Sequence, residues 1–161
     1  MKDGEEIAVA SDHAGVDLKN KITEFIKRLD KGVCDFGTHN RDSVDYPDYG
    51  IPVAQAVSKG KNPRGILICG SGIGMSIVAN KFPGVRAALC FDLYSAKVSR
   101  LHNDANILVL GGRVLDEKTA IEIVRLWLTT EFEGGRHSRR IEKIKEIEEK
   151  KRLTQRTLCR A

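Results

Sequence analysis

Short apolar runs alternate with amphipathic stretches along most of the chain. The apolar runs predict strands at residues 7–10, 32–36, 65–68, 85–91 and 107–110, and helical spacing predicts helices at 16–29, 48–58, 73–80, 92–101, 116–130 and 139–151. Asp48 is the expected N-cap of the second helix. Strands that alternate with helices form parallel sheets covered on both faces. The sequence therefore predicts an α/β fold, a doubly wound three-layer α/β/α sandwich of Rossmann-like type around a five-stranded parallel sheet.

The C-terminal segment has a different pattern. The predicted helix 139–151 carries Ile141, Ile144 and Ile147 on one face and charged residues elsewhere. Such a thin apolar stripe suits a helix that lies against a partner or against its own domain. Residues 152–161 show no clear period. We expect a single domain over residues 1–150 and a disordered tail over residues 151–161.

Composition and charge narrow the possible partners. The chain has 161 residues and a net charge of +5, and ten Lys/Arg against four acidic residues lie in 134–161. The basic excess thus belongs to the C-terminal segment, so we expect no nucleic-acid partner. The four cysteines have no paired spacing, so they suggest neither a zinc site nor a disulfide framework. No signal peptide or bilayer-spanning apolar run is visible, so we expect a cytoplasmic protein without membrane contact.

The segment ILICGSGIGMS, residues 66–76, holds most of the candidate chemistry. A buried strand runs into Cys69, and Gly70, Gly72 and Gly74 follow at every second position. Glycines permit a tight turn and let backbone amides approach a ligand closely. A helix that opens after this turn favours negative charge at its N-terminus, which also favours the thiolate of Cys69. The segment is therefore suited to making and holding an anion.

Simpler interpretations of this segment stay open on the motif alone. A cysteine at a strand end is often only a small buried apolar residue. A dinucleotide site is a second alternative, with Asp92 near the spacing of a ribose-binding acid. A P-loop is excluded because no Gly-Lys-Ser/Thr follows, and a cysteine phosphatase loop would need an arginine at Met75. Cys69 thus fits a base or a packing residue better than a phosphate-attacking nucleophile.

Three further segments carry polar residues of chemical interest. Asp12 and His13 follow the first strand, where Asp12 either caps the next helix or binds a ligand. His102 ends a predicted helix, which indicates either a capping imidazole or a proton-transfer group. Arg136 and Arg140 lie four residues apart after a Gly-Gly turn, so they share a helix face if the helix has begun. Two guanidinium groups on one face suit a phosphate dianion, and the alternative is a solvated basic surface.

Together these segments closely resemble the ribose-5-phosphate isomerase B family, among the sugar-phosphate isomerases that also include galactose-6-phosphate isomerase subunits. The resemblance rests on SDHAG (11–15), DYPDY (45–49), GILICGSGIGMSIVANKFPGVRAA (65–88), SRLHNDANILVLGGR (99–113) and FEGGRHSRRI (132–141). It covers about residues 6–150. Ser71 stands where many relatives have threonine, which keeps the hydroxyl, and the tail is unlike the family.

The resemblance implies a role for each matching residue. It implies that Cys69 is the base that moves a proton between C1 and C2, that Ser71 assists, and that His102 opens the sugar ring as an acid. The implied substrate-binding residues are Asp12, His13, Tyr46 and Asn103 for hydroxyls, Gly70, Gly72, Ile73 and Gly74 for the enediolate, and Arg113, Arg136 and Arg140 for phosphate. It implies no metal and no organic cofactor.

The implied activity is interconversion of ribose 5-phosphate and ribulose 5-phosphate in the pentose phosphate pathway. The resemblance further implies a homodimer or a dimer of dimers, with active sites between subunits and a C-terminal dimerisation helix. Two alternatives remain at this point. One is a six-carbon sugar-phosphate isomerase of the allose- or galactose-6-phosphate type. The other is a non-catalytic sugar-phosphate- or nucleotide-binding module.

Overall fold

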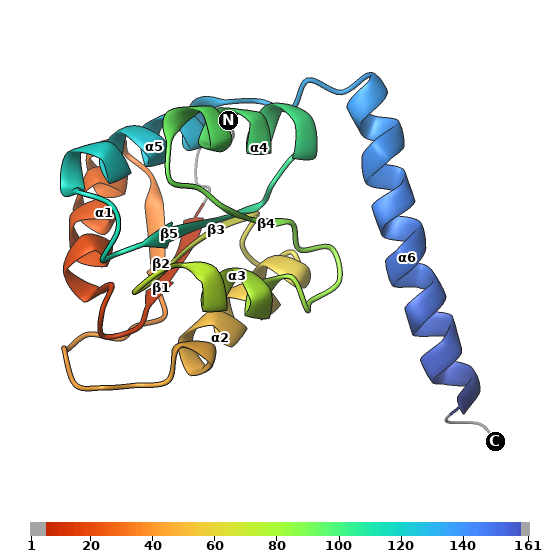
Figure 1. Ribbon diagram of the computed structural model, residues 1–161, viewed down its shortest axis with the longest axis horizontal. Helices are drawn as coiled ribbons and strands as arrows, with labels where there is room; N and C mark the ends of the chain where they lie inside the picture. Colours follow the sequence, from red (N-terminus) through yellow and green to blue (C-terminus); the bar gives the residue numbers. More distant parts are fainter. Residues whose placement is uncertain (1–5, 159–161) are drawn as a thin grey trace.

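Five strands form the central layer of the protein in the computed structural model, which describes residues 6–158 (Figure 1). The strands are β1 (Glu6–Ser11), β2 (Gly32–Asp35), β3 (Arg64–Cys69), β4 (Ala87–Leu89) and β5 (Ile107–Gly111). They lie in the order β2-β1-β3-β5-β4, and each neighbouring pair is parallel. The predicted α/β fold with a five-stranded parallel sheet is confirmed.

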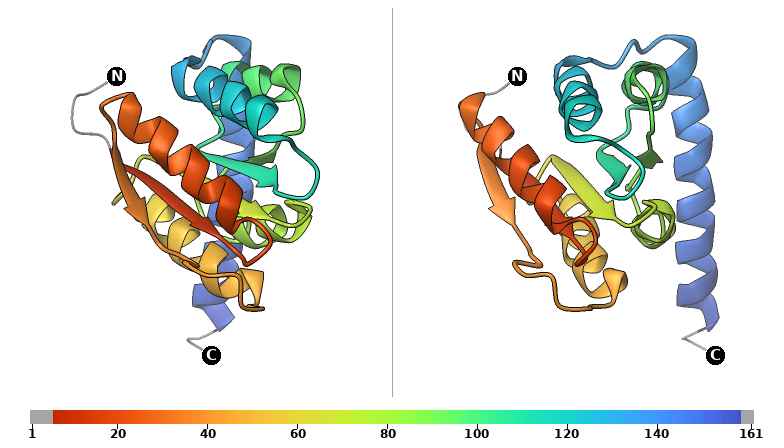
Figure 2. Two further views of the ribbon diagram at one scale, coloured as in Figure 1. Left: turned by 90° about the vertical axis from the view of Figure 1, so that its left-hand side faces the viewer. Right: turned by 60° about the vertical axis from the view of Figure 1, so that its left-hand side comes forward.

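Helices cover both faces of this sheet (Figures 1 and 2). One face carries α1 (Val16–Arg28), α4 (Leu93–Asn103) and α5 (Glu117–Thr129), and the other carries α2 (Tyr46–Ser58) and α3 (Ile73–Ala79). In β3, Ile66 and Ile68 face the α1/α5 side, whereas Leu67 and Cys69 face the α2/α3 side. This alternation buries both faces of the central strands and explains their continuous apolar sequence.

We call the end of the sheet where the strands finish the carboxyl edge, and the end where they begin the amino edge. Hydrogen bonds tie loops to the sheet at both of these ends. At the carboxyl edge, the Gly112 amide donates to the Cys69 carbonyl over 2.8 Å. At the amino edge, the Gly65 amide donates to the Asn106 carbonyl over 2.9 Å. A six-residue strand such as β3 separates these edges by about 16 Å, because each step rises about 3.3 Å.

The observed bounds of α2 and β4 differ from the prediction. Helix α2 begins at Tyr46 with Asp45 as its N-cap, so Asp48 lies in the first turn and does not cap the helix. The reason is Pro47, since proline is well tolerated in the first turn, where its missing N–H costs no helical bond. Strand β4 is limited to Ala87–Leu89 and is shorter than the predicted 85–91. It is an edge strand, with β5 as its single neighbour.

The last helix, α6 (Arg136–Leu158), runs beyond the sandwich (Figure 1). It begins three residues before the predicted start and continues past residue 151 to Leu158, through part of the segment predicted to be disordered, while 159–161 lie outside the described residues. No glycine or proline interrupts 136–158, which allows the helix to continue. Ile141 is 7% exposed, but Ile144 and Ile147 are 42% and 55% exposed, so the isoleucine stripe is only partly covered.

No helix within residues 6–158 is both long enough and apolar enough to cross a bilayer.

Candidate active site

Cys69 ends β3 at the carboxyl edge of the sheet, where the glycine turn begins. Its side chain is 4% exposed and belongs to the core cluster on the α2/α3 side. Its sulfur accepts a hydrogen bond from the Gly72 amide over 3.2 Å. The thiol is thus both sheltered from water and held against the turn.

The turn requires glycine at two positions for different reasons. Gly72 is the N-cap of α3 and has φ +81°, and a side chain there would also collide with Leu89. At Gly74, an added carbon would lie 2.5 Å from Cζ of Tyr46. The ring of Tyr46 therefore lies directly over Gly74, at the first turn of α3. This contact brings the start of α2 to the glycine turn.

The loop after β1 reaches the same edge. The Asp12 amide donates to the Ile68 carbonyl over 3.1 Å, which fixes the loop beside β3. Asp12 Oδ1 accepts hydrogen bonds from the amides of Ala14 and Gly15 at 2.9 and 3.1 Å. The N-cap of α1 is Gly15, so Asp12 lies before the cap position. The Asp12 side chain therefore shapes the turn before α1, and its Oδ2 has no hydrogen-bond partner among residues 6–158.

His13 and Arg113 border the turn from two further loops. The Val44 amide donates to His13 Nδ1 over 3.2 Å, so the proton of the neutral ring lies on Nε2. The Arg113 amide donates to the Gly70 carbonyl over 3.0 Å, and its side chain passes beside Gly70. We call this group the cysteine cluster; its members are Asp12, His13, Tyr46, Cys69, Gly70, Ser71, Gly72, Ile73, Gly74 and Arg113.

Ser71 and Ile73 form the outer side of the turn. The Ile73 amide donates to the Ser71 hydroxyl over 3.3 Å, and both residues are exposed. Asp92, the acid considered for a dinucleotide site, instead caps α4 and accepts from the Ser95 amide over 2.7 Å. Its carboxylate is therefore engaged in helix capping. Hydrogen bonds from the Ser95 backbone and hydroxyl also lower the pKa of Asp92.

His102 lies at the opposite edge of the sheet. Helix α4 starts beside the carboxyl end of β4 and ends at Asn103, just before β5 begins, so its last turn reaches the amino edge. The C-cap is Asp104, with φ 44°, and the His102 ring points to other partners. Its Nε2 lies 3.8 Å from Glu133 Oε2, and its ring stacks on that of His137.

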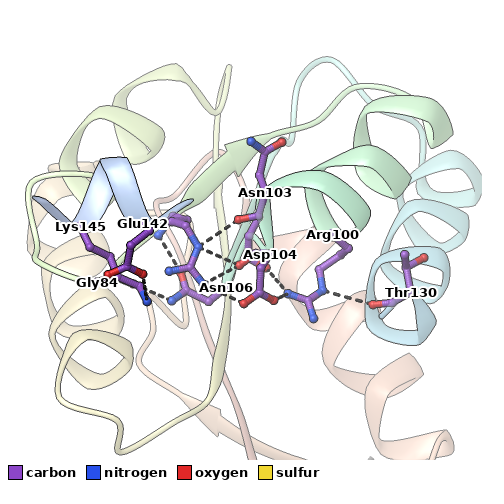
Figure 3. A network of polar contacts seen from close by, with 10 residues as sticks. Gly84, Arg100, Asn103, Asp104, Asn106, Thr130, Glu142 and Lys145 are labelled. Atoms are coloured by element: carbon purple, nitrogen blue, oxygen red, sulfur yellow. Dashed lines mark hydrogen bonds and ion pairs between the residues drawn. The ribbon is translucent and has the colours of Figure 1, made fainter. Parts of the chain in front are cut away.

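A polar network fixes the backbone at the end of α4 (Figure 3). Arg86 Nε donates to the Asn103 carbonyl over 3.0 Å, and Arg86 Nη2 lies 3.0 Å from Asp104 Oδ2. Arg100 Nη1 donates to Asp104 Oδ1 over 2.7 Å. The Asn103 carboxamide points away from this network, as Figure 3 shows. The network therefore holds Asn103 by its main chain and leaves its side chain available for a ligand.

The start of α6 joins His102 at this edge. Arg136 and Arg140 both lie inside the helix and are exposed, so the expected shared helix face exists. His137 is 3% exposed, and its pKa is lowered by burial first and then by the neighbouring His102 and Arg136. We call this group the histidine cluster; its members are His102, Asn103, Glu133, Arg136, His137 and Arg140.

The histidine cluster contains three potential metal ligands. Ligand atoms of His102, Glu133 and His137 lie within 4.8 Å of one another. However, the two ring planes differ by only 4°, so their in-plane lone pairs run parallel and do not converge on one ion. Arg136 Nε also donates to His137 Nε2 over 3.3 Å, which occupies that lone pair. The geometry fits a stacked pair of imidazoles better than a metal centre.

The structure therefore gathers the candidate residues into two groups at opposite edges of one sheet. The cysteine cluster contains ten of the expected residues at the carboxyl edge. His102, Asn103, Arg136 and Arg140 lie at the amino edge and do not join it. Sequence reasoning missed Glu133 and His137, although His137 stands inside the GGRHSRR motif.

Comparison with known proteins identifies the chain. A family model described as Ribose/Galactose Isomerase matches residues 7–144. The chain belongs to the ribose/galactose isomerase family. The ribose-5-phosphate isomerase B of Clostridium thermocellum is 55% identical, with a TM-score of 0.88 over 90% of this chain and 98% of that structure. The Mycoplasma genitalium enzyme, solved with bound ribulose-5-phosphate, is 42% identical, with a TM-score of 0.86 over 89% of this chain and 96% of that structure.

A curated relative from Pectobacterium atrosepticum named D-erythrulose-4-phosphate isomerase is 45% identical over 86% of this chain and 91% of its own length. Relatives within the ribose/galactose isomerase family thus differ in the sugar phosphate that their names give. The family confirms that the protein is an enzyme, a sugar-phosphate isomerase of the aldose–ketose type. A non-catalytic binding module is excluded.

Proposed function

We propose that the protein interconverts ribose 5-phosphate and ribulose 5-phosphate in the cytoplasm, with Cys69 as the base. The observation that carries this proposal is Cys69 itself, a residue that is 4% exposed and whose sulfur lies 3.2 Å from the Gly72 amide. Proton removal beside a carbonyl needs a base near neutrality and donors directed at the developing oxyanion. The turn from Gly70 to Gly74 supplies such amides next to the sulfur. The thiolate takes the C2 proton of the open-chain aldose and returns it to C1 of the enediolate.

Two subunits complete each active site in this proposal. Within one chain, about 16 Å of sheet separates the cysteine cluster from the histidine cluster, given the rise per residue of a strand. A single chain therefore cannot bring His102 to a sugar bound at Cys69. In a two-fold dimer, the histidine cluster of each subunit meets the cysteine cluster of the other, and the interface produces two equivalent sites.

Exposed apolar side chains beside the cysteine cluster support this arrangement. Ile73 and Ile77 on α3 are 54% and 56% exposed, and Leu93 and Tyr94 at the start of α4 are 43% and 76% exposed. These two elements border the edge strand β4. Large apolar surfaces of this kind are typical of interfaces. We infer that this surface packs against a second copy of the chain, in a dimer or a dimer of dimers.

The remaining residues bind and prepare the substrate. His102 donates a proton to the ring oxygen as the C1–O4 bond breaks, and the C1 hydroxyl loses its proton to give the aldehyde. Asp12, His13, Tyr46 and Asn103 contact hydroxyls, and Ser71 assists proton movement.

Arg136 and Arg140, with Arg113, hold the phosphate. Binding energy gained at the phosphate orients the reacting carbons, which lie several bonds away.

The central experiment compares Cys69→Ala with Cys90→Ala. Cys90 is a matched control because it is also buried, 1% exposed, and follows strand β4 of the same sheet. Its pKa is raised by burial, which disfavours its thiolate. We expect Cys69→Ala to lose about 100-fold or more of the turnover with ribose 5-phosphate, as for loss of a general base, and Cys90→Ala to retain it. Undiminished turnover in Cys69→Ala would exclude the assigned base.

Substrate choice is tested with a panel of four-, five- and six-carbon aldose phosphates on the purified protein. The name of the Pectobacterium atrosepticum relative favours including erythrose 4-phosphate. Allose 6-phosphate and galactose 6-phosphate represent the six-carbon alternative. We expect the highest kcat/KM for ribose 5-phosphate. A higher value for another chain length would replace the proposed substrate and leave the isomerase chemistry in place.

A further inference from the structure

His137 is the one residue in the first turn of α6 whose side chain is buried. The residue is 3% exposed, whereas Arg136 and Ser138 on either side are exposed. The proposed reaction assigns it no step. Burying an imidazole removes it from water and needs compensating contacts. Those contacts identify what the residue does.

The ring of His137 contacts two residues that have different roles in the proposed mechanism. It stacks on the ring of His102 with a centroid distance of 4.3 Å and an interplanar angle of 4°. Its Nε2 accepts a hydrogen bond from Arg136 Nε over 3.3 Å. One imidazole thus contacts both the group assigned to ring opening and a group assigned to phosphate binding.

The backbone holds these rings at the junction of α4 and α6. The Glu133 amide donates to the Leu101 carbonyl over 3.0 Å, so the connection before α6 is tied to the last turn of α4. The His137 amide donates to the Gly134 carbonyl over 3.0 Å. The Glu133 carboxylate lies 3.8 Å from Nε2 of both histidines. The stacking is therefore fixed by the chain path as well as by the rings.

We propose that His137 is a positioning residue that holds the His102 imidazole and the Arg136 guanidinium as one unit. This inference rests on the proposed function. A flat ring against His102 restricts the rotation of that imidazole, and the lone pair of Nε2 directs the guanidinium. Burial lowers the pKa of His137, which favours its uncharged form, and an uncharged ring does not repel a protonated His102. Such pre-organisation matters because a misplacement of about 1 Å can cost about 100-fold in rate.

Sugar chemistry supplies a test that separates positioning from general damage. Ribose 5-phosphate is cyclic and must open before its C2 proton can be removed. Ribulose 5-phosphate is acyclic, because the C5 oxygen that would close a five-membered ring carries the phosphate. Exchange of its C1 proton with D2O therefore uses the base and the phosphate site and needs no ring opening. The ratio of the two rates reports on His102 alone.

The experiment uses the full-length protein with His137→Ala and His137→Phe, and Ser138→Ala as the control in the same turn. For each, kcat/KM with ribose 5-phosphate, deuterium incorporation at C1 of ribulose 5-phosphate, and the affinity for inorganic phosphate are measured, with thermal unfolding as a check on folding. His137→Ala should lower isomerisation about 10- to 100-fold, and lower the exchange rate far less. His137→Phe keeps a stacked ring but cannot accept from Arg136. It should largely retain isomerisation at saturation and weaken phosphate binding about 2- to 10-fold.

Two results would overturn the inference. One is an equal fall of isomerisation and exchange in His137→Ala, and the other is full retention of both rates and of phosphate affinity. Should His137→Ala fail to fold, His137→Phe alone decides through its phosphate affinity. If the unsubstituted protein catalyses neither reaction, the proposed function fails, and phosphate affinity in the two variants then decides the inference by itself.

Discussion

Lys19 and Asp35 form an ion pair in which the lysine side chain is fully buried. The Lys19 ammonium lies 2.7 and 2.6 Å from the two carboxylate oxygens of Asp35, and its side chain has no exposed area. Asp35 Oδ1 also accepts from the Gly37 amide over 2.9 Å. The pair therefore joins α1 to the start of the loop that leads from β2 to Tyr46. The cysteine cluster thus depends on a contact that lies outside it.

Replacing Lys19 should destabilise the fold because it leaves a partly buried carboxylate without its cation. We expect Lys19→Met to lower the free energy of unfolding by about 2–4 kcal/mol. The loss is limited because the Asp35 carboxylate, 28% exposed, retains some hydration. Arg41→Met is the matched control. Arg41 contacts Asp17 at 3.0 Å, but both side chains are more than two-thirds exposed. Its loss should cost less than about 1 kcal/mol in urea denaturation. Equal losses in the two variants would contradict this ranking.

Mixing two inactive variants tests whether the active site is shared. In a shared site, a hybrid of one Cys69→Ala chain and one His102→Ala chain has one site with both residues intact and one with neither. Random reassembly gives hybrids in about half of the dimers, so about a quarter of the unsubstituted turnover should return. The measurement is ribose 5-phosphate isomerisation after mixing, mild dissociation and reassociation. No recovery, despite hybrids seen by native mass spectrometry, would contradict the shared active site.

Arg136 and Arg140 should contribute mainly to binding. Each charge-assisted bond to phosphate stabilises the complex by about 1.5–3 kcal/mol, so Arg136→Ala and Arg140→Ala should each raise KM about 10- to 100-fold. Arg139→Ala is the control, because Arg139 is exposed in the same turn and is not on the shared face. Inhibition by inorganic phosphate should weaken in parallel. If all three variants behave alike, the basic surface acts only through its net charge.

Asp116, the N-cap of α5, stabilises the fold by an amount that depends on pH. The Thr119 amide and hydroxyl donate to Asp116 at 2.9 and 2.7 Å, and these bonds lower the pKa of Asp116 in the folded state. A carboxyl with a lowered folded pKa stabilises the fold above its unfolded pKa of about 3.9, and that contribution is lost as the pH falls through the folded pKa.

Asp116→Asn keeps a capping side chain but removes this charge. Its melting temperature should therefore lie below that of the unsubstituted protein near about pH 7, with the difference vanishing below about pH 3. Glu122→Gln, an exposed acid in the middle of α5, is the control and should show no such trend. A difference that is constant with pH would contradict the assignment.

Local sequence predicted most elements of the fold. The run at 65–68 and the helical period at 16–29 each matched an observed element within two residues of its ends. These patterns depend on neighbours along the chain, which the sequence displays directly. The helices predicted to begin at residues 92 and 116 were equally local, and Asp92 and Asp116 are their N-caps. The bounds of α2 and α6 differ from the prediction because Pro47 lies in the first turn of α2 and no glycine or proline interrupts residues 136–158.

Only the tertiary structure decided how the candidate residues are distributed. The sequence displays Cys69 and His102 as motifs, but it does not display the distance between them. That distance follows from the strand order and from α4 returning the chain to the amino edge. The stacking of His137 on His102 likewise depends on the turn of the chain before α6. Residue types and local periods thus determined the chemistry available, whereas long-range packing determined which groups act together, because contacts between distant segments leave no period in the sequence.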